Sequence, residues 1–472
     1  MSGSYDVIVI GAGPAGEVAA GRLGEGGLSV VIIESELIGG ECSYYGCMPS
    51  KGLLRPFEAL EETLRIPGAA EAVTGGVDVE ATFARRDQII HDLDDSGQLP
   101  WLEDRNVAVI RGHGQLVGER MVAVGDETLE ATTAVIVATG THALLPPIPG
   151  LVEAEPWTNR EATTGHTVPG HLIVLGGGPV GSEMAQAYRS FGADVTLVEG
   201  LPRLLGKEEP YAGEQLREAM EAEGISVRTG VKATAVTRAE PGGRVTVELD
   251  DGTSVEGDEL LCAVGRRMLT DDLGLETVGL EPGKPVTVGD DLRVAGHEWL
   301  YAIGDANGRV LLTHMGKYQA RIVADRILGV EREMRSDGPL SPRVTFTSPQ
   351  VAAVGHTLEG AREAGLDAFC VEAGTSASAG GSYYGRNAPG TTRMVIERGT
   401  NRVLGTTIVG AEIADFLHVA TLAVSAELTM DHLWHAVPSF PTRSELWLKL
   451  VEAWEKELGG PAALRTPAPP PC

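Results

Sequence analysis

Short runs of consecutive apolar residues mark the start of the chain. The first run is residues 7–10, a glycine-rich turn follows, and residues 17–23 show a helix-like pattern before a second apolar run at residues 30–33. Apolar runs of this length, bounded by glycine, are typical of strands buried on both faces of a parallel sheet. The order strand, turn, helix, strand therefore predicts a βαβ unit.

The same pattern returns with the apolar runs 172–175 and 195–198, which predicts a second βαβ unit. Such glycines let the main chain approach a pyrophosphate at a helix N-terminus, and an acid at the end of the second strand accepts a hydrogen bond from a ribose hydroxyl. The two predicted dinucleotide sites consist of Gly11, Gly13, Gly16 and Glu34, and of Gly176, Gly178, Gly181 and Glu199. We expect an α/β fold with two Rossmann-like domains.

A pair of cysteines follows the first unit. Cys42 and Cys47 are separated by four residues, and Lys51 comes shortly after them. A structural zinc site usually takes four ligands in paired clusters, whereas the remaining cysteines stand alone; they are Cys262, Cys370 and Cys472. Five cysteines in 472 residues are also too few, and an odd number, for a secreted disulfide scaffold. We interpret the pair as a redox-active dithiol, and we expect no metal site.

Residues 39–51, with the pattern GGEC-x4-C-MPSK, resemble the redox-disulfide signature of the flavoprotein disulfide reductases. That family includes dihydrolipoamide dehydrogenase, glutathione reductase and mercuric reductase. Tyr44 stands where the family usually has asparagine, so we expect a different rim around the site. The resemblance extends over nearly the whole chain. It implies FAD in the first nucleotide unit, NAD(P)H in the second, and a C-terminal α+β domain that forms a homodimer.

The resemblance also implies a division of the chain into domains. We expect an FAD-binding domain, an NAD(P)-binding domain, a central domain that completes the FAD site, a dimerisation domain and a proline-rich tail, at residues 1–153, 154–277, 278–343, 344–460 and 461–472. The tail is not expected to pack. A loose tail is a simpler interpretation of its single cysteine, Cys472, than a redox shuttle.

Further site residues follow from the resemblance alone. It implies that Lys51 lies beside the flavin N5 and pairs with Glu183, which keeps the lysine charged so that it stabilises the reduced, anionic flavin. Hydride would pass from NADH to FAD and electrons onward to Cys47, which leaves Cys42 as the thiol that meets the substrate. Further cofactor contacts are implied for Gly40, Thr139, Gly140, Gly265, Gly304 and Asp305.

The family's active-site histidine is replaced in this chain. That histidine comes from the partner subunit in a His-Pro-Thr-x-Ser-Glu motif, and here the motif begins with Phe440 and ends with Glu445. Phenylalanine neither carries a proton nor stabilises a thiolate. An unassisted thiol of pKa about 8.5 is only a few per cent ionised at neutral pH, and losing a positioned acid–base group typically costs ~10²–10⁴-fold in rate. His435 lies five positions out of register, which argues against it as a substitute base.

We therefore expect an NAD(P)H-dependent flavoprotein oxidoreductase whose dithiol serves a non-standard small-molecule acceptor. Two alternatives stay open: a dihydrolipoamide dehydrogenase-like disulfide reductase that finds its proton elsewhere, and a flavoprotein electron-transfer subunit for a protein partner. The sequence does not name the acceptor. Glu199 favours NADH, because a 2′-phosphate there would meet like charge, while the following Arg203 keeps NADPH use open.

Charge and hydropathy narrow the expected partners and location. The formal net charge of -28 predicts repulsion from nucleic acid and from anionic membrane surfaces. No apolar run approaches the ~18 residues that a spanning helix needs. The first residues lack the basic region of a signal peptide. We expect a cytoplasmic protein, and in that reducing compartment a disulfide is more often catalytic than structural.

Overall fold

The computed structural model describes residues 3–385 and 388–460. The predicted proline-rich tail, and Cys472 with it, lies outside the described residues. The chain forms two compact units. The first consists of the described residues of Met1–Leu53, Val79–Thr167 and Leu260–Gly338, and the second of Leu54–Asp78, Val168–Glu259 and the described residues from Pro339 onward. The finer domain boundaries given above stay a prediction.

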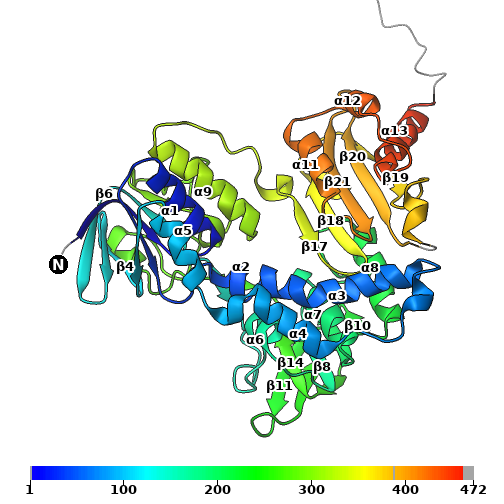
Figure 1. Ribbon diagram of the computed structural model, residues 1–472, viewed down its shortest axis with the longest axis horizontal. Helices are drawn as coiled ribbons and strands as arrows, with labels where there is room; N and C mark the ends of the chain where they lie inside the picture. Colours follow the sequence, from blue (N-terminus) through cyan, green and yellow to red (C-terminus); the bar gives the residue numbers. More distant parts are fainter. Residues whose placement is uncertain (1–2, 386–387, 461–472) are drawn as a thin grey trace, which may run out of the picture. The chain divides into compact units, whose positions relative to one another are not determined.

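A largely parallel sheet forms the framework of the first unit (Figure 1). Its strands lie in the order β3-β2-β1-β6-β5-β4, and β16 also pairs with β6. Their bounds are β1 (Gly3–Ile10), β2 (Val30–Glu34), β3 (Val107–Arg111), β4 (Gly114–Gly118), β5 (Met121–Val124), β6 (Glu127–Val137) and β16 (Leu300–Ala302). β1 pairs in parallel with both β2 and β6, which confirms the Rossmann-like sheet predicted from the apolar runs.

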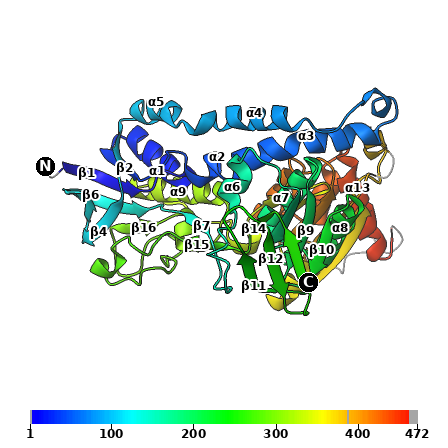
Figure 2. The ribbon, with the colours of Figure 1, turned by 90° about the horizontal axis from the view of Figure 1, so that it is seen from below.

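The helices of the first unit are α1 (Pro14–Glu25), α2 (Gly40–Tyr44), α4 (Val79–Ile89), α5 (Leu99–Glu103), α6 (Asn159–Thr164) and α9 (Thr313–Ile327). α3 (Cys47–Arg65) begins in this unit and ends in the second. Two short strands, β7 (Thr141–Ala143) and β15 (Arg266–Met268), pair antiparallel. α1 and α9 lie side by side in both views of the ribbon (Figures 1 and 2).

Both faces of the first sheet are buried, which explains why its central strands are apolar without alternation. Val7 and Val9 of β1 pack into the core that contains α1 and α9. Ile8 and Ile10 pack into a second core on the opposite face, together with residues of β4 and β5. Successive side chains of a strand point to opposite faces, so a strand covered on both sides needs apolar residues at every position.

The second unit contains the second βαβ pattern. β8 (His171–Leu175), α7 (Pro179–Ser190), β9 (Asp194–Glu199), α8 (Pro210–Ala222) and β10 (Ser226–Thr229) follow in order. β9 pairs in parallel with both β8 and β10. An antiparallel sheet of β11 (Ala233–Arg238), β12 (Val245–Leu249) and β13 (Ser254–Gly257) comes next. β14 (Glu259–Cys262) leads the chain back into the first unit.

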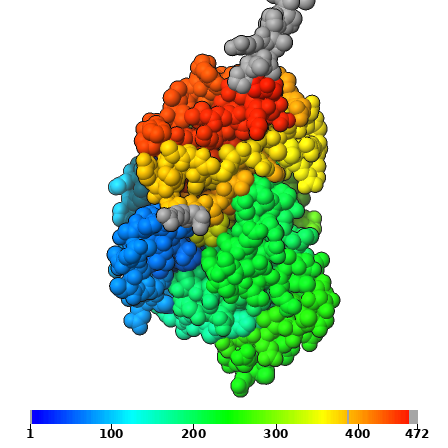
Figure 3. Space-filling view, turned by 90° about the vertical axis from the view of Figure 1, so that its right-hand side faces the viewer, coloured from blue at the N-terminus to red at the C-terminus, as the bar shows by residue number. Residues whose placement is uncertain are grey.

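The C-terminal part of the second unit is an antiparallel sheet packed with helices; in Figure 3 it is coloured from yellow to red. The strand order is β17-β18-β21-β20-β19, with bounds β17 (Arg343–Thr345), β18 (Gln350–Gly355), β19 (Ala368–Gly374), β20 (Thr391–Glu397) and β21 (Val403–Gly410). α11 (Leu417–Ser425), α12 (Met430–His435) and α13 (Glu445–Glu457) share one core with this sheet, and α10 (Leu358–Glu363) packs in a smaller one. The expected α+β domain is confirmed.

The helices can be compared with the length and composition of a membrane-spanning helix. Within residues 3–385 and 388–460, no helix combines the length and the apolar composition that crossing a membrane requires.

Candidate active site

Cys42 and Cys47 lie at the junction of two helices. Cys42 is in α2, and Cys47 is the first residue of α3. Cys42 is half-buried and Cys47 is exposed. A hydrogen bond between the Cys42 and Cys47 side chains, followed by burial, raises the pKa of Cys42. The structure thus brings the side chains of the predicted couple into contact.

α9 contributes two groups with the opposite effect on this thiol. The Thr313 hydroxyl lies 3.4 Å from the Cys47 sulfur, and a hydrogen bond from Thr313 and the positive charge of Lys317 both act to lower the pKa of Cys42. Hydroxyl donors, nearby cations and helix N-termini all favour the thiolate form of cysteine. The first turn of α9 therefore supplies the dithiol with its polar surroundings in this unit.

From the sequence we expected Tyr44 to change the rim of the site, but its side chain does not lie there. Its side chain is 1% exposed, and its ring comes within 3.0 Å of the position that a Cβ atom on Gly39 would take. Burial raises the pKa of its hydroxyl. The replacement of the family's asparagine therefore changes the interior behind the dithiol, because the turn after Cys42 points this side chain inward.

The first fingerprint is built so that a ligand can reach the start of α1. A Cβ on Gly16 would lie 1.9 Å from the Gly11 carbonyl oxygen, so the helix and strand approach too closely for any side chain there. At Gly13, in contrast, no atom lies within 4 Å of the Cβ position. Gly13 is the N-cap residue of α1, adopts an extended conformation and has no side chain to cap the helix. This opening at a helix N-terminus fits a pyrophosphate.

Polar groups around this opening fit the rest of FAD. The Glu34 carboxylate accepts hydrogen bonds from the main-chain N–H groups of Ala12 at 2.7 Å and Glu36 at 2.8 Å, which fix it at the end of β2. The Thr139 hydroxyl is buried and has no protein partner among the described residues. Beside it, the Cβ position of Gly140 faces open space. A buried hydroxyl without a partner is costly, so this group is suited to a ligand.

The dithiol segment begins directly against the fingerprint. A Cβ on Gly40 would lie 2.8 Å from the Cα atom of Gly13. Gly40 also has a φ of 59°, in the left-handed region that favours glycine. These two constraints place the residue before Glu41 and Cys42 at the start of α1, where we predicted a cofactor contact.

Asp305 is held by a chain of side chains in the same unit. Its carboxylate accepts a hydrogen bond from the Thr141 hydroxyl at 2.6 Å, and that hydroxyl accepts one from Arg266 Nε at 2.7 Å. Burial raises the pKa of Asp305. Gly304, just before it, approaches α1, because its Cβ position lies 3.3 Å from Ala15 Cβ. Gly304 of the predicted second FAD motif therefore lies next to the first fingerprint, and Asp305 directly follows it in the chain.

The second fingerprint repeats this construction. A Cβ on Gly181 would lie 1.9 Å from the Gly176 carbonyl oxygen, and the Cβ position of Gly178 is open. The Glu199 carboxylate accepts from the main-chain N–H groups of Gly177 and Leu201, both at 2.6 Å. The carboxylate is thereby fixed at the end of β9, as Glu34 is at the end of β2.

The contacts of three further predicted residues are with protein groups. Gly265 belongs to the first unit, where its carbonyl accepts from the Leu144 N–H at 3.0 Å. Lys51 also belongs to the first unit, and its amine lies 3.3 Å from the Ser50 hydroxyl. Glu183 belongs to the second unit, is 4% exposed and accepts from the Phe346 N–H at 2.9 Å. Their cofactor contacts, and the pairing of Lys51 with Glu183, stay predictions.

The segment that begins with Phe440 has an exposed phenylalanine and a buried glutamate. Phe440 is 76% exposed, whereas Glu445 is buried and accepts a hydrogen bond from the Gly380 N–H at 3.0 Å. His435, at the end of α12, is exposed and packs edge-on against Trp434 with 4.9 Å between ring centroids.

Arg443, inside the same segment, ties it to two other parts of the chain. Its guanidinium donates to the carbonyl groups of Ala411 and Glu412. It also lies over the ring of Tyr384, 4.2 Å from the centroid. With the Glu445 bond to Gly380, these contacts fasten the preceding loop to the start of α13.

One cluster beside the dithiol was not found from the sequence. Glu41, the residue before Cys42, accepts from Asn159 at 2.8 Å and from Arg160 at 2.9 Å, and lies 3.4 Å from Arg266. Arg160 also covers the Tyr45 ring at 4.5 Å from its centroid. The only local indication of this cluster in the sequence is the acidic residue Glu41 inside the cysteine motif. The partners of Glu41 lie more than a hundred residues away.

Comparison with known proteins agrees with this geometry. The family model described as pyridine nucleotide-disulphide oxidoreductase matches residues 5–320, and the dimerisation domain of the same family matches residues 341–451. A dihydrolipoyl dehydrogenase of Thermus scotoductus is 33% identical over 460 residues, covering 96% of this chain and 98% of the relative. A mercuric reductase of Lysinibacillus sphaericus is 31% identical over 448 residues, covering 94% of this chain and 81% of the relative.

The solved structures show the same fold. The HOCl-induced flavoprotein disulfide reductase RclA of Escherichia coli, in a Cu(II) complex, matches with a TM-score of 0.83 at 24% identity, over 96% of this chain and 99% of that one. The residues that frame the first fingerprint fit FAD, and both family domains are present. This chain belongs to the pyridine nucleotide-disulphide oxidoreductases, an FAD-dependent family of enzymes that use NAD(P).

Proposed function

We propose that this enzyme passes electrons from NAD(P)H through FAD and the Cys42–Cys47 dithiol to a small-molecule acceptor other than lipoamide or glutathione disulfide. One observation carries the proposal. At the family's histidine position the chain has Phe440, which is 76% exposed, and Glu445 is engaged by Gly380. This segment therefore supplies no side chain that carries a proton. It also supplies no free carboxylate that could orient such a side chain.

The residues of the first unit have separate roles in this scheme. Bound flavin supplies the redox centre between the nicotinamide and the dithiol. Glu34, Thr139 and Asp305 would hold FAD, because Glu34 and Thr139 lie beside the first fingerprint and Asp305 follows Gly304, which approaches α1. Cys42 is the thiol that meets the acceptor, and the Thr313 hydroxyl lies 3.4 Å from the sulfur of Cys47. An acceptor that takes electrons without needing a proton from the enzyme suits this arrangement; a quinone or a soft metal ion is of this kind.

NADH is the nicotinamide cofactor that we propose. Both oxygens of the Glu199 carboxylate are held by main-chain N–H groups, so the negative charge stays at the end of β9. A 2′-phosphate placed there would be repelled. We propose that the chemistry takes place in the cytoplasm, following the sequence argument above.

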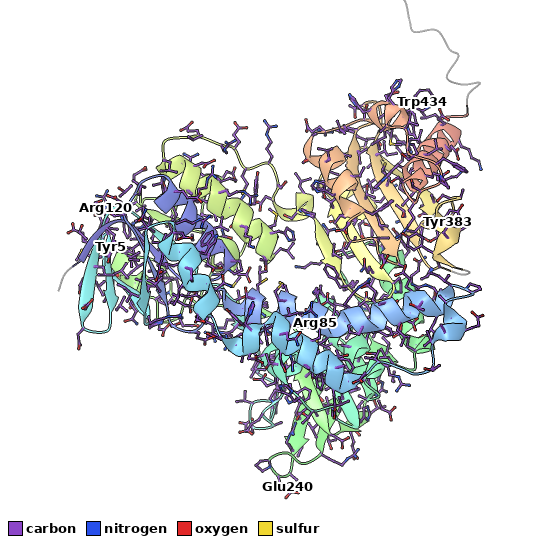
Figure 4. All side chains as sticks on the ribbon, viewed as in Figure 1. Tyr5, Arg85, Arg120, Glu240, Tyr383 and Trp434 are labelled. Carbon is purple, nitrogen blue, oxygen red and sulfur yellow. The ribbon has the colours of Figure 1, made fainter. Side chains whose placement is uncertain are left out.

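A homodimer formed through the C-terminal part is also proposed. Large apolar side chains are exposed on and near α11, α12 and α13; they are Val419, Leu422, Trp434, Val437, Phe440 and Leu448. Trp434 is labelled in Figure 4. Exposed apolar patches of this kind mark interaction surfaces. The match of residues 341–451 to a dimerisation domain supports a second copy of the chain as the partner.

A dihydrolipoamide dehydrogenase-like activity is the second candidate, because relatives of that name are 33% identical over almost the whole chain. Steady-state turnover of NADH with a panel of acceptors separates the two. The panel contains lipoamide, glutathione disulfide, a benzoquinone and Hg(II). We expect the benzoquinone or Hg(II) to be reduced at least tenfold faster than either disulfide, in line with the usual contribution of a positioned acid–base group. Fast lipoamide turnover at neutral pH would favour the second candidate.

A further inference from the structure

The turn between Cys42 and Cys47 is fastened to α6 by hydrogen bonds at both of its ends. The side-chain amide nitrogen of Asn159 donates to the Glu41 carboxylate at 2.8 Å and to the Tyr45 carbonyl at 2.7 Å. Glu41 directly precedes Cys42, and Tyr45 stands two residues before Cys47. All of these residues belong to the first unit. One amide group therefore joins the two ends of the turn that separates the two sulfur atoms.

The orientation of the Asn159 amide is fixed through its oxygen, Oδ1. Arg266 donates to this oxygen at 3.2 Å, and a guanidinium has donors only. Arg266 is itself held by the Thr141 hydroxyl and the Thr141 carbonyl, both at 2.7 Å. Asn159 is 5% exposed, so bulk water does not readily replace a lost partner. The amide nitrogen is therefore the atom that faces Glu41 and Tyr45.

Two more residues of α6 hold the same turn. The Thr163 hydroxyl donates to the Tyr45 carbonyl at 3.1 Å. Arg160 donates to the Glu41 carboxylate from Nε at 3.1 Å and from a terminal nitrogen at 2.9 Å, and its guanidinium lies 4.5 Å from the centroid of the Tyr45 ring. Hydrogen bonds between charged partners are comparatively strong. Three different side chains thus attach the turn to one helix.

α6 is a firm base for these contacts because its own two ends are fixed. At its start, Thr158 and Glu161 form a capping box. At its end, Arg86 of α4 donates to the main-chain carbonyls of Thr163 and Gly165. Arg86 is fully buried, and leaving a buried donor or acceptor unpaired is costly. The helix therefore resists a displacement that would carry the turn with it.

The turn brings the chain before Cys47 back against Cys42. A Cβ on Gly46 would lie 3.5 Å from the Cys42 Cα atom and 3.1 Å from the Glu41 carbonyl oxygen. The Tyr45 N–H donates to that carbonyl at 2.8 Å. A disulfide forms without strain only when the two cysteine backbones lie at a suitable separation. A turn held in this shape keeps the two thiols ready to form the bond.

We propose that Asn159 and Thr163 are positioning residues that hold the turn between Cys42 and Cys47 in the shape the disulfide needs. They thereby set the equilibrium between dithiol and disulfide. When the turn is held, closing the bond costs little conformational freedom. When the turn is released, the open dithiol gains freedom and the disulfide becomes less favoured. The inference rests on the proposed function, because it assumes that this pair is the redox couple between flavin and acceptor.

The test measures the dithiol–disulfide equilibrium rather than turnover. The full, flavin-loaded chain is equilibrated anaerobically at pH 7 with mixtures of reduced and oxidised dithiothreitol. In this exchange the cysteine pair gives two electrons and two protons to oxidised dithiothreitol. A bond forms between the sulfur atoms of Cys42 and Cys47, and the sulfur–sulfur bond of the reagent breaks. Acid quenching, alkylation and mass spectrometry then give the disulfide fraction at each ratio.

Removing the amide should make the disulfide easier to reduce. We expect Asn159→Ala to reach its midpoint at about a tenfold lower ratio of reduced to oxidised dithiothreitol, which is about 30 mV for a two-electron couple. Asn159→Asp should shift the midpoint in the same direction, because it keeps the oxygen that accepts from Arg266 but replaces the donor that faces the turn.

Two neighbouring threonines of α6 give a matched pair. The Thr163 hydroxyl donates to the turn, whereas the Thr164 hydroxyl donates at 2.8 Å to the Arg160 carbonyl within the helix. We expect Thr163→Val to shift the midpoint in the same direction as Asn159→Ala, and Thr164→Val to match the wild type. A merely structural role would lower the thermal midpoints of the oxidised and reduced forms alike and leave the dithiothreitol midpoint unchanged. The visible spectrum of the bound flavin confirms that each variant is folded.

The inference is overturned if the two Asn159 variants and Thr163→Val all titrate at the wild-type ratio, or if Thr164→Val shifts the midpoint as much as Thr163→Val does. A wild type that forms no disulfide at any ratio overturns it as well. A failure of the proposed function alone looks different. In that case NADH releases no new thiol at Cys42 or Cys47 in the wild type, while the dithiothreitol titrations still separate Asn159→Ala from it.

Discussion

Glu445 accepts a hydrogen bond from the main-chain N–H of Gly380, with 3.0 Å between the carboxylate oxygen and the nitrogen. Both groups are buried. The carboxylate that ends the Phe440 segment therefore fastens the loop before β20 to the start of α13. We propose that this carboxylate is structural rather than catalytic, because the side chain of Phe440 offers no imidazole for it to orient.

Removing this carboxylate should destabilise the second unit. In Glu445→Ala the Gly380 N–H is left buried without a partner, which typically costs about 1–3 kcal/mol. Urea unfolding should show a lower midpoint with an unchanged slope. Glu457→Ala, at the exposed end of the same helix, should leave the midpoint within error. An unchanged midpoint for Glu445→Ala would show that the bond contributes nothing.

Placing histidine at position 440 should raise disulfide reduction. Phe440→His supplies an acid–base group at the exposed position where the family carries one, and such a group typically contributes ~10²–10⁴-fold. We expect at least a tenfold gain in kcat/KM with lipoamide at neutral pH, measured by NADH oxidation. Phe440→Leu should give no gain. A wild type that already reduces lipoamide efficiently, with no gain in the variant, argues against the proposed acceptor class.

The charge at Glu199 should decide between the two nicotinamide cofactors. Glu199→Gln keeps an acceptor oxygen but removes the negative charge, so repulsion of a 2′-phosphate falls. We expect the preference for NADH over NADPH, as a ratio of kcat/KM values, to drop by about tenfold or more, given the strength of charge pairs near a protein surface. Arg203→Gln should leave NADH use unchanged. A wild type that prefers NADPH would contradict this account of Glu199.

The half-buried carboxyl of Glu223, directly after α8, predicts a pH dependence of stability. Burial raises the pKa of Glu223 to about 8, Glu61 adds repulsion, and a hydrogen bond from Gln186 acts in the opposite direction. The folded-state pKa lies above the unfolded value of 4.5. Stability from this group is therefore complete at low pH and is lost as pH rises through about 8.

Glu223→Gln removes that titration. The stability of the variant relative to the wild type should increase by about 1 kcal/mol or more between pH 6 and pH 9, measured as free energy of unfolding in urea at both pH values. Glu221→Gln, exposed near the same helix end, is the control and should show no such trend. A constant difference between Glu223→Gln and the wild type would mean that Glu223 ionises normally in the folded protein.

The nucleotide-binding framework could be predicted from the sequence because its signals are local. Val7 to Ile10 are apolar at every position since both faces of β1 are covered. The glycine at 16 is required by a close main-chain approach to Gly11, only a few residues away. The order of strand, turn and helix therefore appears within one short stretch of sequence.

Contacts between residues far apart in the chain could not be predicted in the same way. Glu445 and Gly380 are 65 residues apart, and Glu41 and Arg160 are 119 apart. No local pattern reports such pairs, because folding brings the partners together. The interior position of Tyr44 could not be predicted for a related reason: the motif gives its spacing from Cys42 but not the direction of its side chain.

An anaerobic NADH titration in a stopped-flow spectrometer tests the central claim most directly. The account predicts a long-wavelength thiolate-to-flavin charge-transfer band, together with newly alkylatable thiols at Cys42 and Cys47. Cys42→Ser and Cys47→Ser should each abolish the new thiol pair. Full bleaching of the flavin by NADH with no charge-transfer band and no new thiols would contradict it, because electrons would then leave the flavin without passing through the sulfur pair.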